Sequence, residues 1–166
     1  MRRMDWKNAN IKDLNNCLRM FHINKPERIR NFIAQCTHES LFGKFTQENC
    51  DLKYCSRYEG RKDLKNIQKG DGFKFKGAGY IQLTGKNNYQ KFADFIKDKK
   101  VIEQGFSYVS SNYPWTSAGF WWSQNGMNKL CDKGLPVKII TKRVNGGYNN
   151  GLIQREKYYR RASEIF

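Results

Sequence analysis

The chain has 166 residues, of which 39% are apolar and 14% aromatic. This length suits one domain with its own core, and so many aromatic residues with only three prolines argue against disorder. Lys and Arg number 31 against 15 Asp and Glu, a formal net charge of +16 that predicts attraction to polyanions. The polyanion could be nucleic acid, an anionic membrane or an anionic cell wall. The alternative is a solvated basic surface with no specific partner. No run of about 18 apolar residues is present, so we expect no transmembrane segment.

The first residues, MRRMDWKNANIKDL, are basic but lack the apolar stretch of a signal peptide. We therefore expect synthesis in the cytoplasm without a signal peptide. An extracellular target would then need release by another route, or the chain would be a module of a larger secreted protein.

The five cysteines match no disulfide scaffold and no zinc signature, and only two histidines accompany them. We therefore expect no metal and no cofactor. Three of the cysteines fall on apolar faces of predicted helices and are interpreted as small hydrophobic residues, whereas two could either pair or stay free. The first group is Cys17, Cys36 and Cys131, and the second is Cys50 and Cys55.

Apolar residues at helical spacing predict a first helix through Ile11, Leu14, Leu18 and Phe21, with Asn8 or Asn10 as its cap. Pro26 suits the first turn of a second helix that Gly43 can end. Residues 49–76 are polar and weakly periodic, which predicts a long ordered loop, with a short hairpin within 72–83.

In the second half of the chain, a helix is predicted after Thr84 or Gly85. An almost entirely apolar segment from about Ser117 predicts a central buried helix. Helical packing is expected to continue through 127–131, and Pro136 can open the next helix. The last helix, 152–166, carries Arg155 on its inward stripe, and an inward arginine needs an anionic partner. The sum is a mainly α, single-domain fold over residues 1–166.

Glu39 stands where the helical pattern calls for an apolar residue. It follows Phe32 by seven residues, which brings the two within roughly 20° around the helix axis. Desolvation and the negative end of the helix would both raise the pKa of a carboxyl there, and a protonated glutamate is what a general acid requires. The alternative is a glutamate at the end of the helix that turns outward or pairs with a lysine.

Glu48 lies nine residues further on, past Gly43 and at the edge of the polar loop. We expect it to be more solvated than Glu39 and to stay ionised. Two carboxylates in unlike surroundings are the minimal equipment for hydrolysis of a glycosidic bond. Glu59 is a second candidate for the ionised carboxylate.

Two segments add amides and hydroxyls suited to sugar: GAGYIQLTGKNNY and RVNGGYNNG. Each alone is ordinary turn chemistry. The residues concerned are Tyr80, Gln82, Thr84, Asn88 and Asn145.

The collinear motifs FIAQCTHES, QEN, GYIQLTGKNNY, WTSAGFWW and NGGYNNGLIQRE resemble glycoside hydrolase family 19, which comprises plant-type chitinases and related bacteriophage endolysins. They run from about residue 31 to 156. The resemblance implies a lysozyme-like fold, mainly α with some β (α+β), in which two helical lobes flank a substrate cleft. Ala78 departs from the arginine that many members carry there.

The family pattern implies an inverting mechanism, with Glu39 as general acid and Glu48 as general base about 6.5–9.5 Å apart. Thr84 would hold the attacking water, and Arg155 would orient an acidic residue. The sugar would be bound by Tyr80, Gln82, Asn88, Asn145, Arg155 and Glu59.

The predicted function is hydrolysis of the glycan strand of bacterial peptidoglycan by a monomeric endolysin drawn to an anionic cell wall. A chitinase with the same residues is the first alternative. A wall-binding protein that no longer cleaves is the second. A specific nucleic-acid binder is not expected, because no binding motif accompanies the charge.

Overall fold

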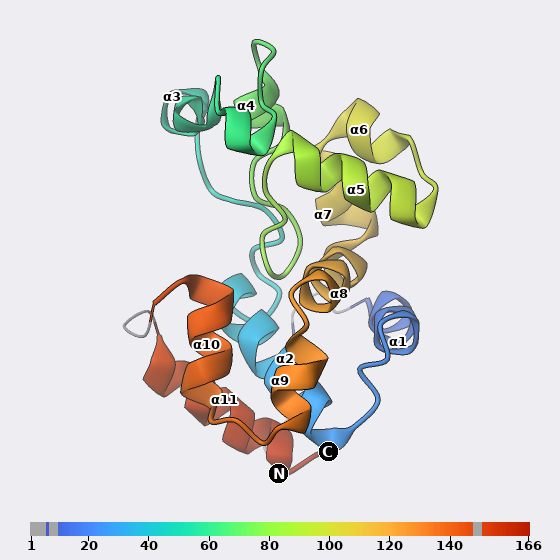
Figure 1. The fold of residues 1–166 in the computed structure, drawn as a ribbon, viewed down its shortest axis with the longest axis vertical. Coiled ribbons are helices and arrows are strands. Elements are labelled where there is room, and N and C mark those ends of the chain that lie inside the picture. Colours follow the sequence, from blue (N-terminus) through green and yellow to red (C-terminus); the bar gives the residue numbers. More distant parts are fainter. Residues whose placement is uncertain (1–5, 7–9, 148–150) are drawn as a thin grey trace. The chain divides into compact units, whose positions relative to one another are not determined.

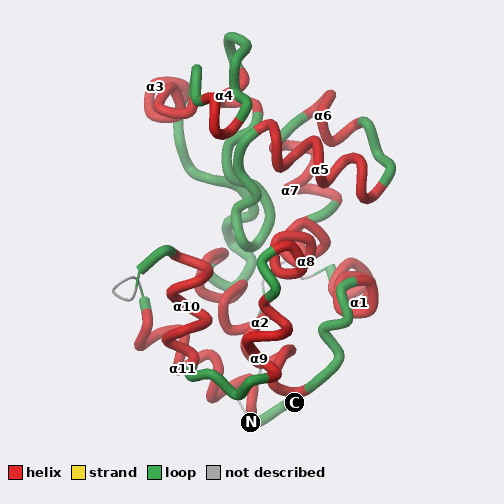
Figure 2. The backbone as a smooth tube through the Cα atoms, viewed as in Figure 1, coloured by secondary structure: helices red, strands yellow, loops and turns green. Residues whose placement is uncertain are grey.

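The computed structural model describes residue 6 and residues 10–147 and 151–166. Helices joined by loops make up this part of the chain, and it contains no strand longer than a single bridge (Figures 1 and 2). The chain divides into two compact units. Unit 1 comprises residues 1–44 and 119–166, and unit 2 comprises residues 45–118. The prediction of a mainly α fold is confirmed, whereas the single domain over 1–166 stays a prediction.

Unit 1 begins with α1 (Ile11–Met20) and α2 (Pro26–Ser40). The side chain of Asn10 caps α1 by accepting a hydrogen bond from the Asp13 backbone N–H at 2.9 Å. The alternative cap, Asn8, lies outside the described residues. Pro26 opens α2 as predicted, but the helix ends at Ser40, before the glycine expected to end it.

The end of α2 is set by backbone geometry. Leu41, Phe42 and Gly43 all have positive φ, so the chain leaves the helix by a left-handed turn. The Ser40 hydroxyl accepts a hydrogen bond from the Gly43 backbone N–H at 2.9 Å and stabilises that turn. Glu39 is therefore in the last turn of α2, where the sequence places it.

Unit 1 is completed by α9 (Met127–Asp132), α10 (Val137–Asn145) and α11 (Leu152–Ser163). The longest packing interface joins α11 to α2, and α9 and α10 also pack on α2 (Figure 1). Burial along α2 begins at Asn31 and includes Phe32, which meets Trp122 edge to face with ring centroids 5.3 Å apart. Cys17, Cys36 and Cys131 are buried, as expected for cysteines that pack as small hydrophobic residues.

Unit 2 contains the region predicted as a long loop, and this region is more helical than expected. It holds α3 (Leu52–Cys55), a 3-10 turn at Ser56–Tyr58, a second at Lys62–Leu64 and α4 (Asp71–Lys74). These pieces are only three or four residues long, too short for a 3.6-residue period to show in the sequence. The predicted hairpin is reduced to isolated bridges that pair Ala78 with Gln47 and Leu83.

The remaining helices of unit 2 are α5 (Lys86–Ile96), α6 (Lys100–Gln104), α7 (Phe106–Asn112) and the first residues of α8 (Pro114–Gln124). The predicted helix after Gly85 is confirmed as α5, and the buried helix expected from Ser117 begins three residues earlier. The sequence did not predict α6 and α7. None of the helices among the described residues has the length and apolar character needed to cross a membrane.

Candidate active site

Glu39 meets Arg155, which comes from α11. A guanidinium nitrogen of Arg155 donates to Oε1 of Glu39, and another donates to Oε1 of Gln35, one turn earlier on α2. Arg155 is 1% exposed, while the Glu39 side chain is 24% exposed. The inward arginine predicted from the sequence therefore pairs with Glu39. Because Arg155 is buried, it positions that carboxylate and has no surface to offer a sugar.

Both sides of this contact are held by further packing. Gln35 donates from its amide nitrogen to the Thr141 hydroxyl of α10 at 3.2 Å, so its orientation is fixed with its oxygen toward Arg155. Gly151, which precedes α11, has φ of +71°, and a Cβ there would lie 1.9 Å from Cε1 of His38. A glycine is needed at this point so that α11 can start close to α2. Burial, aided by the charge of Arg155, lowers the pKa of His38.

Glu48 lies in unit 2 and accepts hydrogen bonds at both oxygens. Its Oε1 accepts from Nη2 of Arg57 at 2.7 Å and from the Tyr58 hydroxyl at 3.0 Å. Its Oε2 accepts from the backbone N–H of Gly77 at 3.3 Å, and its own N–H donates to the Gly77 carbonyl. Its side chain is 20% exposed, so the expectation that Glu48 is more solvated than Glu39 is wrong. The donors around Glu48 hold its carboxyl group in a fixed orientation.

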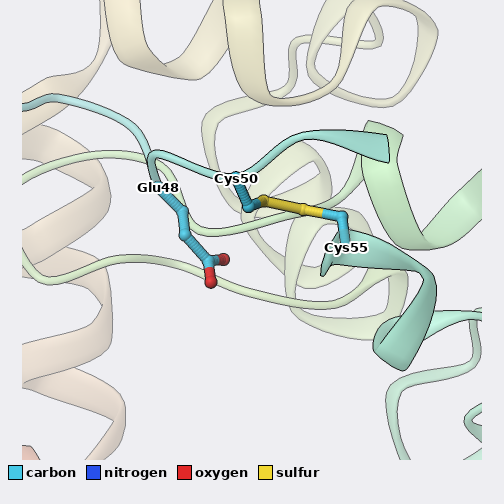
Figure 3. A group of neighbouring side chains, drawn as sticks. All are labelled: Glu48, Cys50 and Cys55. Atoms are coloured by element: carbon cyan, nitrogen blue, oxygen red, sulfur yellow. A yellow bond between two sulfur atoms is a disulfide. The ribbon is translucent and has the colours of Figure 1, made fainter. Parts of the chain in front are cut away.

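The loop that follows Glu48 is closed by a disulfide between Cys50 and Cys55 (Figure 3). Of the two possibilities left open by the sequence, pairing is the one observed. The sulfurs lie within 4.8 Å of the Glu48 carboxylate, but they are bonded to each other. The bond joins the segment that bears Glu48 to the start of the turn that bears Arg57.

The predicted sugar-binding residues of unit 2 have different settings. Tyr80 is 1% exposed and packs edge to face on Trp115, with ring centroids 4.5 Å apart, so its ring belongs to the core. The side-chain amide nitrogens of Gln82 and Asn88 donate hydrogen bonds to the backbone carbonyls of Gly79 and Thr84, at 3.0 and 2.8 Å respectively. Their side-chain oxygens remain the groups that can meet a ligand.

Thr84 is half-buried, and its hydroxyl donates to the Gln82 carbonyl at 2.8 Å. Glu59 accepts a hydrogen bond from the Gly70 backbone N–H at 2.8 Å, which gives its carboxylate a local structural role in the loop. In unit 1, Asn145 is the last residue of α10 and not part of the tight turn that was predicted. The turn itself begins at Gly146, and Tyr148 to Asn150 lie outside the described residues.

Comparisons with known proteins bear on the family and the fold. No protein-family model matches the chain. A glycosyl hydrolase family 19 domain-containing protein from Haemophilus influenzae is 28% identical over 168 residues, covering 83% of this chain and 79% of that protein.

Three solved structures are similar in fold at low sequence identity. Chitinase C from Streptomyces griseus has a TM-score of 0.69 at 15% identity, with 95% of this chain and 84% of the other covered. A bacterial family 19 chitinase has a TM-score of 0.74 at 18% identity, with 93% and 84% covered. A class IV family 19 chitinase from Zea mays has a TM-score of 0.69 at 16% identity, with 96% and 80% covered.

The fold is therefore lysozyme-like and mainly helical, as predicted. Together with the sequence relative, it confirms the resemblance to glycoside hydrolase family 19 seen in the motifs. The predicted class of enzyme, a glycosidase, is confirmed at this level. The roles of the individual site residues and the separation of the two carboxyl groups stay predictions.

Proposed function

We propose that this protein hydrolyses the glycan strand of bacterial peptidoglycan by an inverting mechanism that uses Glu39 and Glu48. The observation that carries the proposal is the contrast between the two carboxylates. Among the described residues, a cation holds Glu39 at one oxygen only. Glu48 accepts three hydrogen bonds, spread over both oxygens.

Glu39 is the general acid in this proposal. Arg155 fixes its Oε1, whereas no hydrogen bond reaches Oε2 from the part of the chain that the structure describes. Oε2 can therefore carry the proton and deliver it to the glycosidic oxygen as the bond to the sugar carbon breaks. The leaving sugar departs as an alcohol, and positive charge develops on the other sugar ring.

Glu48 is the general base. Arg57, Tyr58 and the Gly77 N–H donate hydrogen bonds to it and fix its orientation. It accepts a proton from a water that attacks the sugar carbon from the face opposite the leaving group, and the configuration of that carbon is inverted. The Thr84 hydroxyl is proposed to help hold this water.

Peptidoglycan is preferred over chitin because of charge. A net charge of +16 favours association with an anionic polymer and is of no use on neutral chitin. Chitin remains the second candidate, because the similar solved structures are named chitinases. A wall-binding protein that no longer cleaves is less favoured, since both carboxylates are present and held. Action on the cell wall after release from the cytoplasm is part of this proposal, as is a monomeric state.

The test uses purified peptidoglycan and chitin oligomers as separate substrates for the wild type, Glu39→Gln and Glu48→Gln. We expect new reducing ends from peptidoglycan, with each variant slower by about 10²–10⁴-fold, the usual contribution of a general acid or base. Mass spectrometry identifies the new ends as muramic acid or glucosamine, and nuclear magnetic resonance identifies their anomeric configuration. Cleavage of chitin alone would refute the peptidoglycan proposal. Full activity of the Glu39→Gln variant would refute the role of Glu39 as general acid.

A further inference from the structure

A hollow of about 720 Å³ lies on unit 1, between the start of α9 and the end of α10. Its lining combines exposed basic side chains with half-buried aliphatic ones. We call it the basic groove and define it by Lys129, Lys133, Lys142, Arg143, Leu130 and Ile139.

The charge of this groove is of one sign. No acid lines it in the described part of the chain. The one acid between residues 125 and 146 is Asp132, and it is already neutralised by two other cations. Nε of Arg28 donates to its Oδ1 at 2.8 Å, and Nζ of Lys25 donates to its Oδ2 at 3.2 Å.

A second hollow provides a comparison. It measures about 560 Å³ and is lined by α5, α6 and the turn between them, which contributes Lys97 and Lys99. Three acids accompany those two lysines: Asp94, Asp98 and Glu103. Two cations against three acids leave no excess of positive charge there, so a high net charge does not by itself make every hollow of this protein basic.

The basic groove adjoins a residue predicted to bind the glycan. Lys142 lies three positions before Asn145 on α10, and residues at this spacing are neighbours on a helix surface. Gly146, which follows Asn145, also lines the groove. A glycan strand bound at Asn145 would therefore have the groove beside it.

The groove is not built to hold a sugar ring or a base. None of its lining residues is aromatic, within the described part of the chain, whereas bases are held by stacking on aromatic rings. It offers ammonium groups, one guanidinium fork suited to a carboxylate, and an aliphatic surface. This combination fits a short acidic chain with small apolar side groups.

We propose that the basic groove binds the acidic peptide that peptidoglycan carries on its glycan strand. The peptide carboxylates pair with Lys129, Lys133 and Arg143, and its alanine methyl groups contact Leu130 and Ile139. The groove thereby distinguishes peptidoglycan from chitin, which has no such appendage. This inference rests on the proposed function for its substrate, but it is a statement about binding and can be tested separately from cleavage.

The experiment measures dissociation constants by calorimetry for soluble peptidoglycan strands, with all proteins in the Glu39→Gln background so that the strands stay intact. One strand preparation keeps its peptides, and the other has been stripped of them by an amidase. The groove pair is Lys129→Gln with Lys133→Gln. The control pair is Lys97→Gln with Lys99→Gln, which removes the same charge from exposed lysines of the second hollow.

We expect the groove pair to weaken binding of peptide-bearing strands by about fivefold, since two exposed ion pairs contribute roughly 0.5 kcal/mol each. The control pair should change it by less than about twofold. On stripped strands the two pairs should bind alike. Matching circular dichroism melting curves would show that both variants are folded.

Three results would overturn the inference. Equal weakening by both pairs would mean diffuse attraction to the whole surface. Weakening of stripped strands by the groove pair would mean that the groove touches the glycan. Tighter binding of polyglycerol phosphate than of peptide-bearing strands, lost in the groove pair, would mean that the occupant is a phosphate polymer. If instead the peptide-dependent binding is found while the wild type cleaves nothing, the groove stands and only the proposed hydrolysis fails.

Discussion

Replacing Arg155 by leucine should be costly, because it removes a buried cation that serves two partners. Arg155 is 1% exposed, and the variant would leave the buried oxygen of Gln35 without its donor and Glu39 without its counter-ion. Removing one partner of a fully buried pair typically costs about 3–5 kcal/mol. Glu39 is 24% exposed and can regain water, which lowers its share. We therefore expect a loss of about 2–4 kcal/mol in the free energy of unfolding.

Urea denaturation followed by circular dichroism measures this change. Glu39→Gln is the matched control, because an amide oxygen can still accept a hydrogen bond from Arg155, and we expect it to cost only about 1 kcal/mol. The double variant should be more stable than the sum of the two single losses predicts, because the two side chains are in contact. A free energy of unfolding for Arg155→Leu within 0.5 kcal/mol of wild type, taken as the usual range of surface substitutions, would refute the assigned contact.

Three further predictions concern Arg57, the Cys50–Cys55 disulfide and His38. Arg57→Leu should lower the cleavage rate while leaving the melting temperature nearly unchanged, because exposed ion pairs contribute little to stability; an unchanged rate would show that Arg57 does not position Glu48. The double variant Cys50→Ser with Cys55→Ser should lose about 2 kcal/mol in the free energy of unfolding by the loop-entropy relation. The wild type melted in dithiothreitol should have the same melting temperature as this variant. If the reductant does not change the melting temperature, the disulfide is absent in solution. Because the pKa of His38 is lowered from 6.5, the unfolded chain binds more protons just below pH 6.5, so stability should fall as pH drops through that region. His38→Gln should flatten this slope in denaturant titrations at stepped pH, and an unchanged slope would assign it to other groups.

Several features of the site followed from the sequence because they depend on local spacing. The helical period placed Glu39 at the last turn of α2 and Arg155 on the inward stripe of α11, and the structure has both there. The cap at Asn10 and the start at Pro26 also followed, since these residues act through their own backbone.

The partners of these residues required the tertiary structure. Arg155 reaches Glu39 across 116 positions of the chain, and no local period encodes such a pairing. The sequence also missed Arg57 and Tyr58 as donors to Glu48, because they approach it only through the turn that follows the Cys50–Cys55 disulfide.

Burial was the other property that only the fold could decide. Tyr80 was predicted at the substrate surface because it stands among glycines and amides, yet its ring packs on Trp115. The neighbouring Gln82 stays half-exposed. Sequence thus determined which side chains share a helical face, whereas long-range packing determined which of them water and a substrate can reach.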